Sequence, residues 1–195
     1  MEPGEHVDRV FEELELVDTT LRGASFESCT FRRCRIESAR VVDCRFTDCT
    51  FDHCDLVSVR FPDCSLVDVT FRGGRAMGVD LSGVRDLVLS MSFAEVAMDY
   101  SNFTGLPLKG TVFSDCRLRE ATFSQCDLSK ASFTGCDLSG AVIRHAKLVQ
   151  TDFEGATGVV VDAQTCTMKF TRVDADAALF LLKDLGVLCS ELGVR

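Results

Sequence analysis

A large apolar residue recurs at every fifth position along most of the chain. The first series runs from Phe11 to Phe71 without an exception and continues weakly to Leu81. The phase then shifts by two residues, and a second unbroken series runs from Phe93 to Phe153. This period matches neither the helical repeat of about 3.6 residues nor the two-residue alternation of a flat strand. It predicts short extended segments, each followed by a turn.

A second, smaller side chain accompanies each large one. It stands two residues earlier in the repeat and is usually Cys or Ala, whereas the remaining positions are mostly polar. We therefore expect the large and small residues to face inward and the polar residues to form turns and an outer wall. One such unit cannot bury its own core, so successive coils must stack, about 4.8 Å apart. The predicted core ladder includes Phe26, Phe31, Phe46, Phe51, Phe61, Phe71, Phe113, Phe123, Phe133 and Phe153.

Three consecutive repeats carry a recognisable motif. Residues 126–130, 131–135 and 136–140 read Cys-Asp-Leu-Ser-Lys, Ala-Ser-Phe-Thr-Gly and Cys-Asp-Leu-Ser-Gly. They resemble the A-[DN]-L-x-x unit of the pentapeptide-repeat family. The resemblance implies an all-β fold, a right-handed quadrilateral β-helix with four repeats per coil, over residues 1–173. Roughly 28 repeats would give about seven coils and a rod of about 34 Å at the spacing of paired strands.

The two series are separated by an interruption, Ser82–Ser92, where the phase slips. The segment is too short for a separate domain, and its Val, Leu and Met residues can still pack. We interpret it as an irregular coil or small bulge, with a functional loop as the alternative.

The last residues, 174–195, follow a different pattern. Asp174 is predicted to cap an α-helix that runs to about Leu185 and ends at Gly186. Its apolar residues lie on more than one side, so it needs two partners. We expect it to cap the last coil and to pair with the same helix of a second subunit; capping alone is the alternative. The predicted dimer interface comprises Ala178, Phe180, Leu181, Leu182, Leu185 and Val187.

Cysteine is abundant, with 11 residues, but its spacing argues against a metal site or a disulfide framework. No C-x-x-C occurs, and within each group the cysteines are separated by multiples of five residues. Zinc ligands are usually only two to four residues apart. We therefore predict a structural role in the core. The chain begins with an acidic segment instead of a secretory signal, and no apolar run reaches the length of about 20 residues that a membrane span needs. We expect a cytoplasmic protein without membrane contact.

The sequence offers no catalytic constellation. His6 lies in the acidic amino-terminal segment, whereas His53 and His145 occupy outward repeat positions on different coils. No motif joins any of them to an activated Ser or Cys, and the glycines mostly fall in turns. We predict that the protein is not an enzyme and uses no cofactor or metal.

Acidic charge is concentrated at the two ends of the chain. The net charge is −9, of which residues 1–20 contribute −6 and residues 174–195 contribute −2. Because a step of 20 residues returns to the same face, we expect Asp43 to stack on Asp63 on one face and Asp48 on Asp68 on another. These four acids are the candidate partner-facing residues. An acidic chain is a poor nucleic-acid ligand, and its natural partner is a basic, DNA-binding surface.

Over nearly its whole length the chain resembles the topoisomerase-protecting branch of the pentapeptide-repeat family, which includes quinolone-resistance and albicidin or microcin immunity proteins. Residues 76–80, 100–103, 116–153 and 178–187 carry the resemblance. It implies a rod-shaped homodimer, formed through the carboxyl-terminal helix, that mimics DNA, binds DNA gyrase and counters its inhibitors.

Two features depart from that branch. No long protruding loop is evident, and the early coils are locally basic at Arg32, Arg33, Arg35, Arg40 and Arg45. The alternative function is a protein-interaction scaffold unrelated to gyrase.

Overall fold

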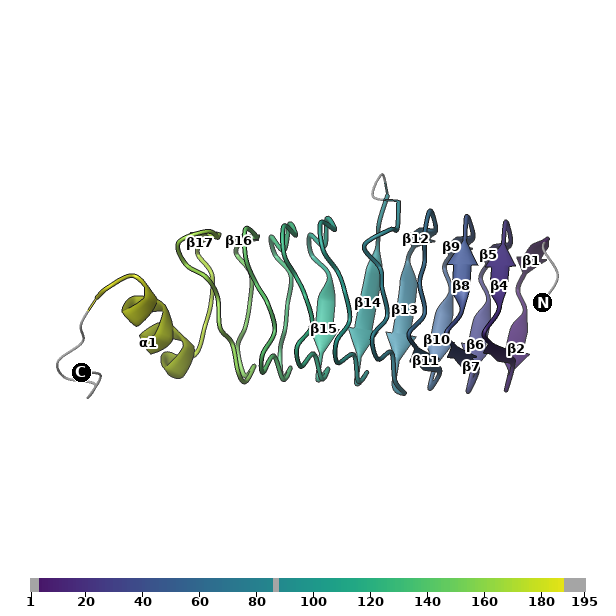
Figure 1. Ribbon diagram of the computed structural model, residues 1–195, viewed down its shortest axis with the longest axis horizontal. Coiled ribbons are helices and arrows are strands. Elements are labelled where there is room, and N and C mark those ends of the chain that lie inside the picture. Colours follow the sequence, from purple (N-terminus) through teal and green to yellow (C-terminus); the bar gives the residue numbers. More distant parts are fainter. Residues whose placement is uncertain (1–3, 86–87, 188–195) are drawn as a thin grey trace.

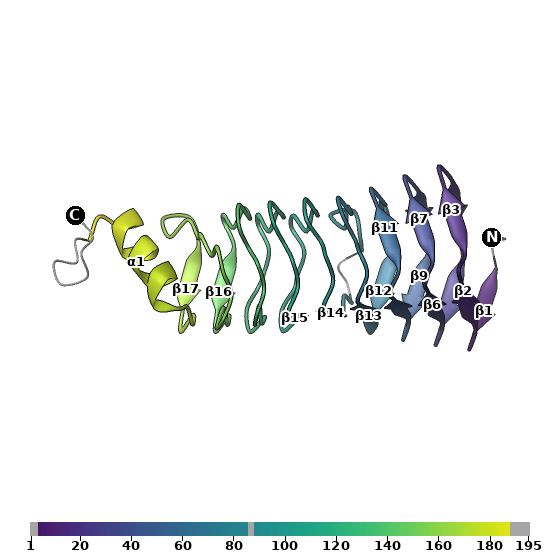
Figure 2. The same ribbon diagram turned by 90° about the horizontal axis from the view of Figure 1, so that it is seen from below.

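The computed structural model describes residues 4–85 and 88–187, which form a rod (Figures 1 and 2). It is a β-solenoid of about eight turns with parallel strands and one short carboxyl-terminal helix, which confirms the predicted fold class. The expected number of about seven turns is too low. Residues 5–7 and 167–169, outside the two five-residue series, also pair with neighbouring coils. Residues 86–87 of the interruption lie outside the described residues.

Each coil has four sides, and strands twenty or so residues apart stack on the same side. Side 1 contains β1 (Glu5–Val7), β5 (Ser25–Glu27), β9 (Arg45–Thr47) and β12 (Ser65–Val67). Side 2 contains β2 (Val10–Glu12), β6 (Thr30–Arg32), β10 (Thr50–Asp52), β13 (Val69–Arg72), β14 (Met91–Ala94) and β15 (Val112–Ser114). Side 3 contains β3 (Glu15–Val17), β7 (Arg35–Glu37) and β11 (Asp55–Val57); side 4 contains β4 (Thr20–Arg22) and β8 (Arg40–Val42). Near the carboxyl end, β16 (Lys147–Val149) pairs with β17 (Thr167–Lys169).

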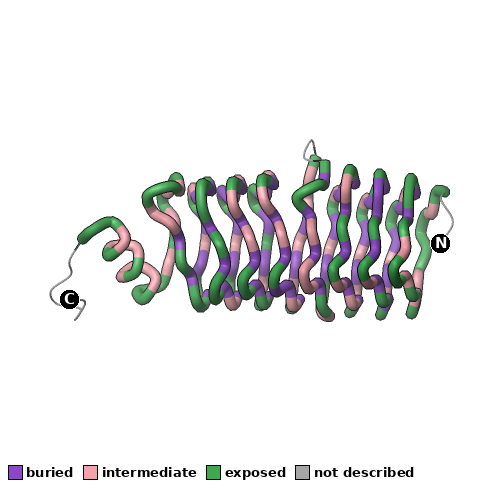
Figure 3. Tube along the Cα trace, viewed as in Figure 1, coloured by how far each residue is buried: buried purple, intermediate pink, exposed green. Residues whose placement is uncertain are grey.

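Backbone hydrogen bonds join each coil to the next in a fixed register. The N–H of Thr50 donates to the carbonyl of Cys29 at 2.9 Å, and the N–H of Asp43 donates to the carbonyl of Pro62 at 3.0 Å. The register places like repeat positions directly above one another. The central residue of most strands is therefore buried, and Figure 3 shows buried positions recurring along the coils.

Phenylalanine rings stack in a continuous column on side 2. Neighbouring centroids are 4.7 to 5.1 Å apart along the column. Such offset stacking adds to the stabilisation from burial alone. The column consists of Phe11, Phe31, Phe51, Phe71, Phe93, Phe113, Phe133 and Phe153. The other predicted ladder residues, Phe26, Phe46, Phe61 and Phe123, are also buried.

The small inward residues do more than fill space. The thiol of Cys34 donates to the carbonyl of Phe11 at 3.2 Å, and that of Cys126 donates to Phe103 at 3.0 Å. Thr151 makes the equivalent bond to Leu128 at 2.7 Å. Burial raises the pKa of Cys126 to about 11, so its thiol keeps the proton that it donates. Where Cys or Thr occupies this small position, its side chain therefore also donates a hydrogen bond, which the equivalent Ala residues cannot do.

The corners between sides are built from residues in the left-handed backbone region. Asp43, Asp48, Asp63 and Asp68 have φ between 51° and 59°. Asp and Asn tolerate this conformation better than most residues because their short side chains form local hydrogen bonds. This explains why acids recur at the repeat's turn position.

The interruption lengthens one coil by two residues without breaking the solenoid. β13 and β14 pair with Phe71 opposite Phe93, a separation of 22 residues. On either side of this coil the separation is 20, as between Phe51 and Phe71. Val84 and Met91 within it are buried. These contacts favour the structural reading of the segment.

The carboxyl-terminal helix, α1 (Ala175–Asp184), lies across the end of the last coil (Figure 1). Asp174 occupies the N-cap position, but its side chain makes no capping hydrogen bond and accepts instead from the N–H of Gly155 at 3.2 Å. The prediction of side-chain capping was wrong, because the last coil competes for that carboxylate. Gly186, with φ of 75°, follows the helix as expected. Among the described residues, no helix has the length and apolar character to cross a membrane.

Replacing one ring in the stacked column should destabilise the fold far more than replacing a ring outside it. Phe113 is 0% exposed and stacks between Phe93 and Phe133, so Phe113→Ala should cost about 3–5 kcal/mol of unfolding free energy. Phe170 is 78% exposed, and Phe170→Ala should change stability by about 0.5 kcal/mol or less. Urea titrations followed by circular dichroism compare the two variants. Equal midpoints would contradict this account of the column.

Candidate interaction surfaces

The four candidate acids flank side 1. Asp43 and Asp63 stack at its corner with side 4, and Asp48 and Asp68 stack at its corner with side 2. The sequence-based expectation assigned the two pairs to different faces. The structure places them on the two edges of one face, because turn residues occupy corners.

Only part of this acidic charge is neutralised by the described residues. Asp43 pairs with Arg85 at 2.5 Å, across two coils. Asp68 accepts from the hydroxyl of Ser90 at 2.7 Å, and Asp48 accepts from Ser28 at 3.3 Å. A hydroxyl satisfies a carboxylate oxygen without cancelling its charge. Both edges of side 1 therefore keep negative charge that is open to solvent.

Sides 2 and 3 carry a different arrangement, in which acids and bases alternate from coil to coil. On side 2 the register places Arg32 between Glu12 and Asp52, and Asp52 is followed by Arg72. On side 3 Arg35 lies between Glu15 and Asp55. Opposite charges on directly paired residues are mutually stabilising. Arg32 and Arg35 of the locally basic early coils thus belong to two charge ladders, Glu12–Arg32–Asp52–Arg72 and Glu15–Arg35–Asp55–Arg75. Arg40 instead lies opposite Arg60, and Arg45 lies in β9 on side 1.

Ion pairs within these ladders are formed directly. Arg32 contacts Asp52 at 3.4 Å and Arg75 pairs with Asp55. Arg33, a turn residue beside the ladder on side 2, also contacts Glu12 at 2.6 Å. These sides present balanced charge, which accounts for the near-neutral body of the rod.

Acids in the second half of the rod are also largely paired. Lys147 contacts Asp127 at 3.3 Å and Arg172 contacts Asp152 at 2.8 Å, each from the next coil. Among the acids that the structure describes, Asp99 has the most buried carboxylate, with a side chain that is 8% exposed and pairs with Arg117 at 2.7 Å. Negative charge is consequently most open at side 1 of the early coils and in the first coil itself.

Arg119 and Asp137 form a further pair, in which the ionised acid is favoured. Burial by itself raises the pKa of Asp137, but the hydrogen bonds from Ser139 and the charge of Arg119 outweigh it and lower the pKa. Arg119 lies 2.6 Å from this carboxylate. The ionised form of Asp137 is therefore specifically stabilised in the folded protein.

The helix α1 contacts the last coils through both polar and apolar residues. The carboxylate of Asp184 accepts from the N–H of Ala163 at 3.1 Å, and Ala177 and Leu181 pack against the core. None of the helix residues is buried. The predicted interface residues Ala178 and Leu182 are half-buried, whereas Phe180, Leu185 and Val187 are 45%, 55% and 46% exposed.

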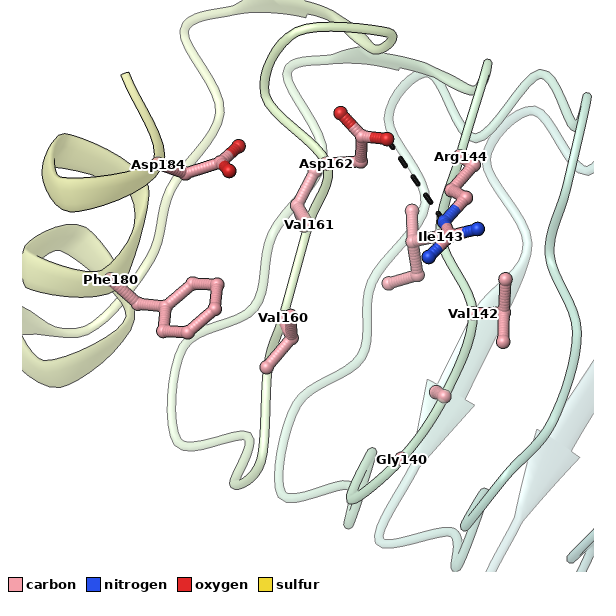
Figure 4. Close-up of a pocket in the computed structure, with 10 residues that line it drawn as sticks. Gly140, Val142, Ile143, Arg144, Val160, Val161, Asp162, Phe180 and Asp184 are labelled. Carbon is pink, nitrogen blue, oxygen red and sulfur yellow. Dashed lines mark ion pairs between the residues drawn. The ribbon is translucent and has the colours of Figure 1, made fainter. Parts of the chain in front are cut away.

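A cleft of about 400 Å³ separates part of α1 from the solenoid (Figure 4). Phe180 points into it toward Val160, and Arg144 and Asp162 lie 4.0 Å apart at its wall. A second cleft of about 330 Å³ also includes Phe180 and Val160. The helix thus covers the coil loosely and leaves apolar surface on both sides of Phe180.

The three histidines do not come together. His53 is exposed and contacts Asp52 at 2.9 Å, and His145 is exposed several coils away. His6 occupies an inward position and stacks on Phe26 with centroids 4.9 Å apart. Within residues 4–85 and 88–187, no group of His, Cys, Asp and Glu is arranged to hold a metal ion.

Sequence reasoning missed two features that carried a signal. Stepping by twenty from Glu12 or Glu15 reveals the alternating charges, and stepping back by twenty from Phe26 places His6 in the core ladder. The apolar residues on more than one side of α1 were visible in the sequence, but the clefts beside Phe180 depend on packing distances and left no such signal.

Comparison with known proteins supports the repeat. A family model described as "Pentapeptide repeat region" matches residues 8–77, 24–103 and 44–122. A second, described as "Pentapeptide repeats (8 copies)", matches residues 116–155. No curated protein sequence matches the chain significantly.

Several solved structures resemble the fold. A QnrB1 variant, a plasmid-mediated fluoroquinolone resistance protein, is 22% identical over 92% of this chain and 99% of its own, with a TM-score of 0.42. HetL of the cyanobacterium Nostoc sp. strain PCC 7120, which is involved in heterocyst differentiation regulation, is 16% identical over 86% and 87%, with a TM-score of 0.39. A thylakoid-lumen protein of Arabidopsis thaliana is 24% identical over 57% and 75%, with a TM-score of 0.45. These neighbours do not discriminate between roles.

Acid should remove the contribution of Asp137 to stability. Because its pKa is lowered in the folded state, its stabilisation is present above its unfolded value of 3.8 and is lost as the pH falls through the folded value. Asp137→Asn keeps the acceptor for Ser139 but loses the ion pair, so it should cost up to about 1 kcal/mol at pH 7 and almost nothing at pH 2. Urea unfolding at both pH values measures this. The control Glu120→Gln, which changes an exposed acid, should show a smaller difference in unfolding free energy between the two pH values. A loss of stability for Asp137→Asn that grows toward low pH would contradict the lowered pKa of Asp137.

Proposed function

Because the chain belongs to the pentapeptide-repeat family, we propose that it is a non-catalytic, DNA-mimicking protein that binds DNA gyrase or a related type II topoisomerase and protects it from inhibitors. The observation that carries the proposal is the acidic side 1, with Asp43 and Asp63 along one edge and Asp48 and Asp68 along the other. The resemblance of its sequence to the topoisomerase-protecting branch supports the choice of partner.

The geometry of side 1 suits a surface that normally binds DNA. Each edge carries carboxylates that repeat at the coil spacing of about 4.8 Å, so two roughly parallel rows of acids flank the strands of side 1, where Glu27 and Arg45 are also exposed. A basic groove shaped for two phosphate strands would be attracted to such rows and steered onto them. The balanced ladders on sides 2 and 3 offer no comparable attraction. We therefore assign side 1 as the enzyme-facing surface.

We also propose that the protein acts as a homodimer through α1. Phe180, Leu185 and Val187 expose apolar surface that a second helix would cover, in a two-fold arrangement. Eight coils span about 38 Å, and two rods joined at their carboxyl ends would span about 76 Å, close to 22 base pairs of duplex at about 3.4 Å each.

The alternative function is a scaffold that binds a partner unrelated to gyrase. The charge ladders and the open helix surface would serve such a role equally well. A neighbouring antibiotic-biosynthesis cluster favours immunity, whereas fusion of relatives to signalling domains favours the scaffold.

The direct test is a pull-down with gyrase followed by a supercoiling assay in the presence of an inhibitor. We expect the protein to bind gyrase and to restore supercoiling in a concentration-dependent manner. Inhibitors from different classes, assayed in parallel, identify which poison is countered. The proposal would be refuted if the protein neither bound nor protected gyrase and likewise neither bound nor protected topoisomerase IV.

Reversing the charge of side 1 should weaken gyrase binding. The variant Asp43→Lys, Asp48→Lys, Asp63→Lys, Asp68→Lys should raise the Kd at least ten-fold, which is about 1.4 kcal/mol. A matched control reverses four exposed acids on the other corners: Asp18→Lys, Glu95→Lys, Asp115→Lys, Glu120→Lys. Biolayer interferometry at two salt concentrations measures both, and equal losses in the two variants would show that net charge, not side 1, determines affinity.

Introducing a charge into the exposed apolar surface of α1 should separate the subunits. The ring of Phe180 would be desolvated in the predicted interface, so Phe180→Asp should convert a dimer into a monomer in sedimentation equilibrium at micromolar concentration. Val112→Asp places the same charge on an exposed side chain of β15, remote from α1, and should leave the dimer intact. A wild-type protein that sediments as a monomer would contradict the dimer.

A further inference from the structure

Within residues 4–85 and 88–187, the first coil of the solenoid has a coil on one side only, whereas α1 lies across the last coil. In every later coil of the early rod, one N–H per side donates to the coil before it: Thr30 donates to Arg9 at 2.8 Å and Arg35 donates to Leu14 at 2.8 Å. Val10 and Glu15 are the equivalent residues of the first coil. Among the described residues, no coil lies in front of them to accept these bonds.

Two backbone carbonyls of the first coil also point away from the second coil. The carbonyl of Arg32 accepts from Glu13 and that of Glu37 accepts from Asp18, both at 2.9 Å, so these groups point toward the preceding coil. Glu12 and Val17 present the equivalent carbonyls at the edge. Two donors and two acceptors around the corner between sides 2 and 3 are therefore aligned to pair with an added strand.

Side chains at this edge are incompletely covered as well. Phe11 and Leu16 are only partly buried, whereas Phe31 and Ile36, one coil on, are 3% and 5% exposed. Val10 is 60% exposed. The phenylalanine column of side 2 thus ends on Phe11, over whose ring the exposed Arg9 places its guanidinium, 5.4 Å from the centroid.

Both charge ladders end on an acid at this edge. Going toward the first coil, side 2 reads Arg72, Asp52, Arg32, Glu12. Side 3 reads Arg75, Asp55, Arg35, Glu15. The residue that continues each alternation is therefore a base.

We propose that the first coil binds an extended, arginine- or lysine-rich segment of a partner protein, which adds to sides 2 and 3 as an extra parallel strand. Its residue opposite Phe11 is aromatic or large and apolar, and its residues opposite Glu12 and Glu15 are basic. Main-chain hydrogen bonds to Val10 and Glu15 supply the pairing, and the two ladders supply the specificity. The inference is independent of the topoisomerase role.

A second copy of the chain does not fit this edge. Two first coils meeting end to end would oppose their acids, six in residues 4–20 against one Arg. A head-to-tail stack is blocked because α1 covers the other end of the rod. Charge complementarity leaves a basic segment as the occupant.

The chain itself provides a probe of the required pattern. Residues 30–37, Thr-Phe-Arg-Arg-Cys-Arg-Ile-Glu, already lie against the other edge of the first coil with bases opposite Glu12 and Glu15. A synthetic peptide of these residues with Cys34→Ala is the test ligand. The control peptide carries Arg32→Glu and Arg35→Glu in addition.

Nuclear magnetic resonance titration of the full chain with both peptides tests the proposal. We expect the basic peptide to shift the amide signals of Val10 and Glu15 saturably and to bind at least ten-fold more tightly than the control peptide. The chain variant Glu12→Lys, Glu15→Lys should reverse this preference, whereas Glu95→Lys, Glu120→Lys should keep it.

A backbone variant provides an independent criterion. Val10→Pro removes an N–H that makes no bond to the second coil, so the fold should persist while peptide binding falls at least ten-fold. Equal binding of both peptides, shifts confined to other coils, undiminished binding by Val10→Pro, or self-association through this edge in sedimentation velocity would each overturn the proposal.

Discussion

Backbone hydrogen bonds between successive coils impose one register on every side chain of the rod. The bond from Thr50 to Cys29, at 2.9 Å, is repeated with little variation from coil to coil, and it places residues 20 positions apart directly opposite one another. A side chain therefore meets its own repeat equivalent above and below. The phenylalanine column follows from this constraint, as do the thiol-to-carbonyl bonds such as Cys34 to Phe11. Even the two-residue interruption is absorbed so that Phe71 still faces Phe93.

The same register determines how charge is displayed. Where the outward residue alternates in sign every 20 positions, as from Glu12 to Arg32 to Asp52, the side is balanced and its charges are paired. Where acids recur at a turn position, as at Asp48 and Asp68, they accumulate along a corner. Different sides of one rod can thus have different partners. The net charge of the chain does not show which side carries the unpaired acids. The same reasoning makes the first coil selective, because both ladders end there on an acid.

Much of this organisation was predictable from the sequence. The five-residue period specifies the coil and the core ladder, and Asp174 and Gly186 bracket the helix, because both signals are local. Positions that depend on how the coil closes were harder to predict from the sequence. The four candidate acids were expected on two faces, but turns in the left-handed backbone region place them on two edges of one face. The carboxylate of Asp174 was expected to cap α1, but a nearby backbone donor, Gly155, takes it instead. Packing of α1 against the last coil depends on distances that no periodicity encodes.

The most direct measurement of the central claim, that the register creates one acidic face for a DNA-binding partner, is hydrogen–deuterium exchange of the chain with and without gyrase. The account predicts slower exchange in the peptides that contain residues 43–48 and 63–68, with little change at residues 32–35 and 52–55, where charge is balanced. Protection centred on the balanced ladders, or no protection at saturating gyrase, would contradict it.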